Sequence, residues 1–279
     1  MSDPHLVHRK VQEQAHAFTT DPFTSLVSVE LNITELCNRK CSFCPRADPE
    51  VYPNRKLHMK HDVAVAVAAD LAKHKSPARI SFSGFGEPLL HPLFDSLIRT
   101  FRQYLPDSTI ECNTNGDRLT ADRTRSLFMA GLSWLYVNMY DGPEQEAPFR
   151  KMMHEAGAVN FKLRPHWSED FGLNLNNRSG TLKGQEAVTG RCHYPFYKTI
   201  VDWNGDVLFC SNDWGRKIIV GNVLNESLRD IWLGEKLKEI RLGLACGNRD
   251  RDPCNKCSVV GTLTGKRSFD LLMETYGHG

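Results

Sequence analysis

The segment from Cys37 to Cys44, CNRKCSFC, decides how this chain is interpreted. It carries three thiols at spacings of four and three residues, directly after residues 26–34, whose apolar and β-branched side chains predict a strand. A tetrahedral zinc ion or a fully ligated iron–sulfur cubane needs a fourth ligand nearby, and none follows. The pattern predicts a four-iron cluster with one iron open to another ligand. A three-cysteine zinc site, or three unrelated thiols, is the alternative.

Strand-like and helix-like segments alternate after this loop. Strands separated by helices of about 10 to 15 residues imply βαβ units and a parallel sheet. Five or six such units fall short of a closed eight-unit barrel, so we expect the α/β class with a partial (β/α)6 TIM-like barrel. The expected strands are 78–83, 108–113, 134–139 and 159–164, and the expected helices are 61–74, 92–104, 120–130 and 144–156.

The chain is expected to contain an N-terminal extension or first helix (1–23), the partial barrel (24–185) and a small cysteine-rich C-terminal domain (186–279). Residues 165–190 are rich in Gly, Asn and Ser and predict a linker or a substrate-facing segment. In the C-terminal domain, Asn204-Gly205 between two strand-like segments predicts a hairpin with a type I′ turn, and a helix is expected over 227–244.

Composition excludes several classes of function. The chain has 279 residues, of which 41% are apolar and 24% charged, and its net charge is +2. No basic tract predicts a nucleic-acid partner, and no apolar run approaches the roughly 18 residues of a membrane span. The polar start lacks the apolar core of a signal peptide, so we expect a cytoplasmic protein with no membrane partner.

Nine cysteines are therefore interpreted for a reducing compartment, where metal ligation is more common than disulfide formation. Three lie in the 37–44 loop and five lie in the last third of the chain. Cys112 stands alone in an expected strand, where we expect it to be a core residue.

The 37–44 loop resembles that of the radical S-adenosylmethionine (SAM) superfamily, in which CxxxCxxC follows the first barrel strand. Phe43 matches the aromatic residue that precedes the third cysteine. Residues 83–88, SGFGEP, resemble the family's Gly-Gly-Glu-Pro segment, although Phe85 replaces the first Gly of that quartet. Residues 113–116, NTNG, resemble its Thr-Asn-Gly segment.

The resemblance implies a reaction and a site. The open iron of a [4Fe–4S] cluster binds SAM, and an electron from the reduced cluster cleaves SAM to a 5′-deoxyadenosyl radical. A reductase or flavodoxin-type protein is the implied electron donor. The implied cluster ligands are Cys37, Cys41 and Cys44, and the implied SAM contacts are Phe43, Gly84, Gly86, Glu87, Pro88, Asn113 and Asn115.

The C-terminal cysteines resemble the auxiliary-cluster domain of the same superfamily, called SPASM or, in its shorter form, twitch. The shorter form holds one cluster through four thiolates, which implies a second [4Fe–4S] cluster in this chain. A zinc ribbon built from the same thiolates is the alternative. The implied ligands are Cys192, Cys210, Cys254 and Cys257.

Cys246 is left over once both clusters have their ligands. It could donate a hydrogen atom to a substrate radical, replace a ligand, or be a buried free thiol. Size and layout resemble an epimerase and an aminocyclitol dehydrogenase of aminoglycoside antibiotic biosynthesis. We expect an epimerase that acts on a sugar or aminoglycoside with Cys246 as the catalytic hydrogen donor. Oxidation of a secondary alcohol and peptide modification are the alternatives.

A cationic substrate of this kind would favour carboxylates near the site. Asp141, Glu144 and Glu146 follow the strand at 134–139 and are candidates for that contact. An exposed acidic helix start explains them equally well.

Overall fold

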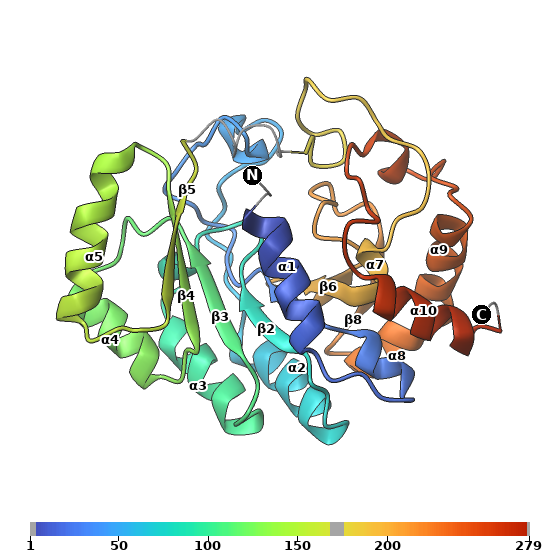
Figure 1. Ribbon diagram of the computed structural model, residues 1–279, viewed down its shortest axis with the longest axis horizontal. Helices are drawn as coiled ribbons and strands as arrows, with labels where there is room; N and C mark the ends of the chain where they lie inside the picture. The colour runs from blue at the N-terminus through green and yellow to red at the C-terminus, as the bar shows by residue number, and fades with distance from the viewer. Residues whose placement is uncertain (1–3, 168–175, 278–279) are drawn as a thin grey trace.

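A single eight-stranded sheet joins the two predicted parts of the chain. The structure is a computed structural model that describes residues 4–167 and 176–277. The strands are β1 Ser28–Leu31, β2 Arg79–Phe82, β3 Ile110–Thr114, β4 Trp134–Met139, β5 Phe161–Pro165, β6 Lys198–Val201, β7 Asp206–Leu208 and β8 Ile219–Asn222. Their order in the sheet is β5-β4-β3-β2-β1-β6-β7-β8 (Figure 1). The strands from β5 to β6 in this order are parallel, and β7 and β8 are antiparallel.

Helices follow most of the parallel strands, as the alternating pattern predicted. Thr120 shows how the sequence begins one of them, because its hydroxyl accepts a hydrogen bond from the Arg123 N–H and caps the helix. The helices are α1 Pro4–Ala15, α2 His61–Lys73, α3 Phe94–Tyr104, α4 Ala121–Met129, α5 Glu146–Glu155, α7 Tyr194–Tyr197, α8 Leu228–Leu233, α9 Glu235–Ala245 and α10 Lys266–Thr275. Short 3-10 turns are η1 Pro22–Ser25, η2 Pro45–Ala47, η3 Pro88–Leu90, η4 Pro143–Gln145 and η5 Cys254–Lys256.

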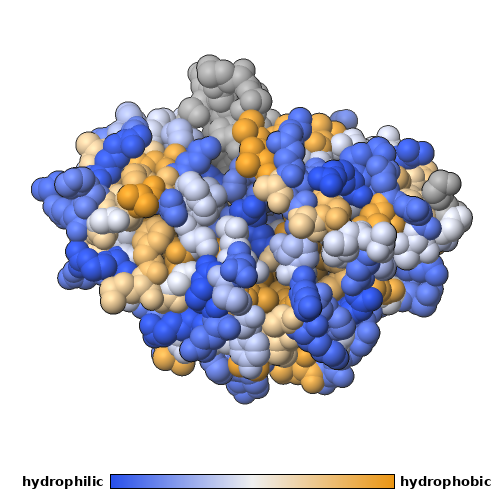
Figure 2. All heavy atoms as spheres, turned by 60° about the horizontal axis from the view of Figure 1, so that its bottom comes forward, coloured by the Kyte–Doolittle hydropathy of each residue, from blue (hydrophilic) through white to orange (hydrophobic). Residues whose placement is uncertain are grey.

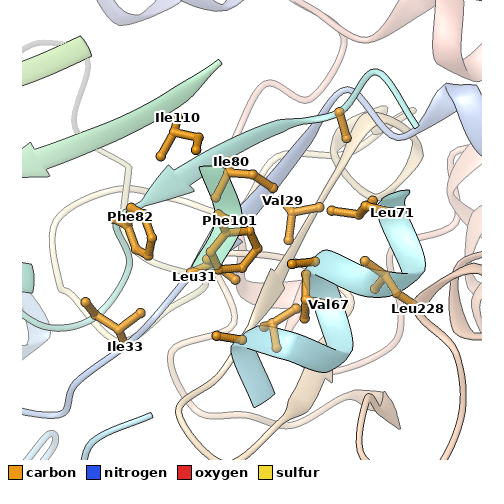
Figure 3. Packing of buried hydrophobic residues seen from close by; sticks show 14 of the residues in the cluster. Val29, Leu31, Ile33, Val67, Leu71, Ile80, Phe82, Phe101, Ile110 and Leu228 are labelled. Atoms are coloured by element: carbon orange, nitrogen blue, oxygen red, sulfur yellow. The ribbon is translucent and has the colours of Figure 1, made fainter. Parts of the chain in front are cut away.

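Alternation along each strand separates an apolar face from a polar one. On β1, Val29 and Leu31 are fully buried, and Ile80 and Phe82 of β2 lie beside them. These side chains pack against helices α2 and α3 and form the core (Figure 3). Each fully buried large side chain contributes roughly 1.5–3 kcal/mol. Cys112 belongs to this core with no exposed surface, which confirms the prediction for it.

The predicted α/β fold class is confirmed, with one difference in how its sixth parallel strand is placed. In a barrel built in chain order this strand would lie beyond β5, but β6 pairs with β1, with Ser28 opposite Lys198. Hydrophobic spacing predicts that a segment is a strand but does not determine its neighbours. Because β6 falls in the predicted C-terminal domain, that part of the chain is hydrogen-bonded to the strand that precedes the cysteine loop.

Two local predictions differ from the structure. In the hairpin between β6 and β7, only Gly205 has a positive φ (90°), and its N–H bonds the Asp202 carbonyl. This is a three-residue type of connection ending in a left-handed glycine, not a type I′ turn. The helix expected over 227–244 is two helices, α8 and α9. They are separated at Gly234, whose extended backbone (ψ 155°) interrupts the helical hydrogen bonds.

The surface carries no large uninterrupted apolar area on the face shown in Figure 2, where hydrophobic residues are scattered among hydrophilic ones. In the described parts of the chain, no helix has both the length and the apolar character that crossing a membrane requires.

Candidate active site

The three-cysteine loop follows β1 after residues 32–36 and is held by local hydrogen bonds. Asn54 clamps its start, because its side chain accepts from the Cys37 N–H (2.9 Å) and donates to the Cys37 carbonyl (3.0 Å). The Cys44 N–H bonds the Cys41 carbonyl in a tight turn. Burial, together with the neighbouring Cys44 and Cys37 thiols, raises the pKa of Cys41 to about 11. The three sulfurs are therefore close enough to influence one another.

This donor set fits an iron–sulfur cluster. In the described residues, no group of three or more His, Cys, Asp or Glu side chains is arranged to hold a single metal ion. The thiolates of a cubane each bind a different iron, so their sulfurs lie further apart than those around one zinc ion. Cys37, Cys41 and Cys44 all line one cavity, into which the remaining iron of such a cluster would face.

The turn after β2 passes too close to the cysteine loop to carry a side chain at Gly86. A Cβ there would lie 2.0 Å from the Thr34 carbonyl oxygen. Gly84 has a φ of 133°, which only glycine adopts easily. Both glycines line the cavity, and their contact with SAM stays a prediction. Pro88 is buried and starts η3.

Glu87 is a buried carboxylate that joins the turn after β2 to the end of β3. It accepts hydrogen bonds from the Thr114 hydroxyl (2.6 Å), the Asn115 N–H (2.8 Å) and the Leu89 N–H (3.1 Å). Burial raises its pKa to about 7 despite these donors. Its side chain holds the Asn115 segment in place, and a direct contact with SAM stays a prediction.

Phe43, Asn113 and Asn115 also line the cavity, and their contact with SAM stays a prediction. The Phe43 ring lies 5.5 Å from the ring of Tyr140. Asn115 donates to the Asn38 side chain (3.0 Å), which ties it to the cysteine loop. Asn113 accepts from Arg164 (2.7 Å) inside the barrel. The structure thus brings every predicted SAM-site segment to the same cavity.

The cavity has a volume of about 560 Å³ and extends from the cysteine loop into the barrel. Its walls are the polar faces of the strands, which carry both charges and neutral amides. The Lys198 ammonium lies 2.7 Å from Glu30, and the Arg164 guanidinium lies 4.0 Å from the centre of the Tyr136 ring. The strand residues that give it this character are Glu30, Ser81, Asn113, Asn138, Arg164 and Lys198. Such a lining suits a polar molecule with several hydrogen-bonding groups.

Two of the three candidate acidic residues after β4, Asp141 and Glu146, form ion pairs with arginines. The Arg39 guanidinium bonds Asp117 through Nε (2.7 Å) and Asp141 through Nη1 (2.7 Å). The hydrogen bond from Arg39 lowers the pKa of Asp141. Asp141 thus anchors the cysteine loop and is not free to bind a cationic substrate. Glu146 pairs with Arg150 on the surface of α5.

The C-terminal cysteines come together at the base of the β6–β7 hairpin. Cys192 precedes α7, Cys210 follows β7, and Cys254 and Cys257 flank η5. Burial raises the pKa of Cys192 to about 11 and that of Cys254 to about 12, and neighbouring thiols add to both shifts. Backbone N–H groups of Asn212 and Val259 point at the Cys210 and Cys257 sulfurs (3.4 Å each). Amide hydrogen bonds to sulfur are typical of cluster sites.

Two residues that sequence reasoning missed support this second set of thiols. A Cβ on Gly261 would lie 2.3 Å from the Cys192 sulfur, so only glycine fits there. Asn177, within the expected linker, donates to the Lys256 carbonyl (2.7 Å) and accepts from the Ser258 N–H (3.0 Å). This part of the expected linker therefore packs against the loop that carries Cys254 and Cys257. Gly172 and Asn174 of the same segment lie outside the described residues.

Cys246 is not at the cavity. It is exposed at the C-terminal end of α9, where its N–H bonds the Leu242 carbonyl. Among the described cysteines, only those of the 37–44 loop line the cavity. Counting the ligands required by two clusters identified Cys246 as the remaining thiol but could not show which way it faces.

The N-terminal helix α1 is a further part of the site that the sequence did not reveal. It lies across the sheet between the barrel and the C-terminal part (Figure 1). His8 and Gln12 approach the buried Glu111 of β3 (3.7 and 3.3 Å), and Arg9 donates to the Tyr194 hydroxyl (2.8 Å). All three α1 residues line the cavity. In the sequence, the feature that could have indicated this role is the spacing of His8 and Gln12, which lie one helical turn apart.

Family comparisons agree with this geometry. Residues 31–162 match the model of the radical SAM superfamily, and residues 192–258 match that of the SPASM iron–sulfur cluster-binding domain. The two matches include all of the cysteines assigned to the two clusters. The chain belongs to the radical SAM superfamily and carries a SPASM domain, and its cofactors are SAM and [4Fe–4S] clusters.

Several known proteins resemble the chain. The S-adenosyl-L-methionine-dependent 2-deoxy-scyllo-inosamine dehydrogenase of Niallia circulans is 29% identical over 259 residues, which cover 91% of this chain and all of that protein. The tungsten-containing aldehyde ferredoxin oxidoreductase cofactor-modifying protein of Pyrococcus furiosus is 28% identical. That match covers 39% of this chain and 29% of the Pyrococcus protein. The crystal structure of BtrN with AdoMet and 2-DOIA has a TM-score of 0.75 at 27% identity, and the match covers 86% of this chain and 96% of BtrN.

The tight fit at Gly261 predicts a selective loss of iron. We expect anaerobically reconstituted protein to hold about eight iron atoms per chain, as two four-iron cubanes require. In Gly261→Ala the new methyl group displaces Cys192, so we expect about four. Gly243→Ala is the control, because a Cβ there meets nothing within 4 Å. Full iron content in Gly261→Ala, or zinc in the C-terminal site, would contradict this assignment.

The raised pKa of Glu87 predicts a pH dependence of stability. Because the folded-state pKa (about 7) exceeds the ordinary value of 4.5, the contribution of Glu87 is fully present below pH 4.5 and is lost as the pH rises through 7. We therefore expect the melting temperature of the wild type to fall more steeply between pH 5 and 8 than that of Glu87→Gln, measured by calorimetry.

Glu111→Gln is the control for this experiment. Burial alone would raise the pKa of Glu111, but His8 and Arg79 lower it. Its carboxylate therefore stays ionised between pH 5 and 8, and its own titration affects stability only at lower pH. Parallel melting curves for the wild type and Glu87→Gln would show that Glu87 does not titrate in this range.

Proposed function

We propose that this protein is a SAM-dependent dehydrogenase that oxidises a secondary alcohol of an aminocyclitol-type substrate to a ketone. The observation that carries the proposal is the position of Cys246, which is exposed and lies away from the cavity. Epimerisation needs a hydrogen donor facing the substrate radical, whereas oxidation does not. Similarity to a dehydrogenase over 91% of this chain supports the same choice.

The reaction removes one hydrogen atom, one proton and one electron from the alcohol. When bound, SAM and the clusters supply the radical that takes the hydrogen atom and the acceptor for the electron. The chain itself must bind the substrate, orient it and keep water away from the radical. The barrel cavity, which is continuous with the thiols of Cys37, Cys41 and Cys44, is the place where these tasks can be met together.

Polar side chains on the cavity wall fit the chemistry of an aminocyclitol, which carries hydroxyl groups and an ammonium group. Glu30 and Asn138 offer oxygen acceptors, while Arg164 and Lys198 offer donors. Several of these groups hold one another in place, as the Glu30–Lys198 and Asn113–Arg164 contacts show. A wall arranged in advance loses little side-chain entropy when a ligand binds.

The epimerase interpretation, with Cys246 as hydrogen donor, is less well supported by this geometry. The predicted reductase or flavodoxin-type electron donor remains part of the proposal, as does the aminoglycoside-related substrate class.

Product analysis in deuterium oxide distinguishes the two reactions. The reconstituted enzyme is incubated anaerobically with SAM, a reductant and 2-deoxy-scyllo-inosamine, and the products are examined by mass spectrometry. We expect the substrate to be oxidised to a ketone, with no deuterated epimer of the alcohol, and equal turnover by Cys246→Ala. One solvent deuteron on a carbon of an unoxidised product, lost in Cys246→Ala, would instead support epimerisation.

A further inference from the structure

Arg216 links the SPASM domain to the start of the cysteine loop. It lies in the loop after Cys210, and its guanidinium forms ion pairs with Asp202 at the end of β6 and with Glu35 (2.6 Å to Glu35). Its third contact is the Tyr52 hydroxyl (2.5 Å). The side chains of Glu35 and Asp202 are only 6% and 1% exposed. Among the described residues, Arg216 is the cation that forms an ion pair with each of these two buried carboxylates.

The same two carboxylates hold Asn32. The Asn32 amide nitrogen donates to Glu35 (3.0 Å) and to Asp202 (2.7 Å). Its carbonyl oxygen then points the other way and accepts the backbone N–H groups of Phe85 (2.9 Å) and Gly86 (3.1 Å). A continuous chain of hydrogen bonds thus runs from Arg216 through Asn32 to the turn after β2, which belongs to the SAM site.

Phe85 adds an apolar contact along the same route. This residue replaces a glycine of the family pattern, and its ring is buried 4.6 Å from Trp214 and 5.9 Å from Tyr52. The Arg216 guanidinium lies over the Phe85 ring at 5.0 Å. Trp214 and Arg216 both belong to the SPASM domain. This domain therefore contacts Phe85, the residue that differs from the family pattern.

We propose that Arg216 and Trp214 are positioning residues, through which the SPASM domain holds the turn at Gly84–Gly86 in the conformation that binds SAM. Asn32 transmits the effect of Arg216, and Phe85 transmits that of Trp214. SAM affinity in this protein therefore depends on SPASM-domain residues that contact the turn from outside the radical SAM barrel. The proposal holds for any substrate, since it concerns SAM binding alone.

The test measures SAM affinity and cluster content separately in anaerobically reconstituted protein. We expect Arg216→Ala to keep its iron but to bind SAM at least about tenfold more weakly. An effect of this size corresponds to the loss of one charge-assisted hydrogen bond. Arg216→Lys should fall between, because an ammonium cannot pair with both carboxylates in fixed geometry. Equilibrium dialysis gives the affinity, and the change that SAM causes in the EPR spectrum of the reduced cluster gives a second reading.

Arg229→Ala is the matched control. The Arg229 side chain is 27% exposed, close to the 25% of Arg216, and it forms an ion pair with Asp21, which is distant in sequence. Its ion pair involves neither Asn32 nor the turn. We expect it to bind SAM normally. Normal affinity in Arg216→Ala, or an equal loss in Arg229→Ala, would overturn the proposal. Should Arg216→Ala lose iron, Trp214→Leu decides: weaker SAM binding with full iron supports the proposal, and unchanged binding overturns it.

Discussion

The pairing of β6 with β1 is the constraint on which the rest of the structure depends. β1 is hydrogen-bonded to β2 on one side and to β6 on the other, and its carboxyl end leads into the cysteine loop. Backbone hydrogen bonds therefore fix the SPASM domain against the strand that positions the SAM cluster. Asn32 lies just beyond β1, between the ends of the two neighbouring strands. Its side chain bonds Asp202, which follows β6, and the N–H of Phe85, which follows β2.

The polar interior of the barrel has an energetic cost that the structure offsets by pairing charges. Placing a carboxylate away from water is costly unless a cation or several donors face it. Glu111 meets His8 and Arg79, and Glu30 meets Lys198, so the cavity wall stays charged without isolated ions at these positions. A binding surface for a polar substrate is thus built into the fold, while the apolar faces of the same strands form the core.

Local patterns in the sequence predicted the parts of this molecule that depend on neighbouring residues. The spacing of Cys37, Cys41 and Cys44, the segments at 83–88 and 113–116, and most strands and helices follow from short stretches of chain. Contacts between distant segments were not predictable in this way. Arg216 reaches Glu35 across 181 positions, and Gly261 makes room for Cys192, yet neither carries a local signal. The structure does not support the expected epimerisation for the same reason. The direction in which Cys246 faces is set by the packing of α9, which the local sequence does not show.

If the radical and an alcohol substrate meet in the one cavity, deuterium is transferred from the substrate to 5′-deoxyadenosine. 2-Deoxy-scyllo-inosamine carrying deuterium at the carbon to be oxidised is incubated anaerobically with enzyme, SAM and reductant, and 5′-deoxyadenosine is analysed by mass spectrometry. We expect one deuterium in 5′-deoxyadenosine for each ketone formed. Ketone formed with unlabelled 5′-deoxyadenosine, or cleavage of SAM without any oxidation of this or related aminocyclitols, would contradict it.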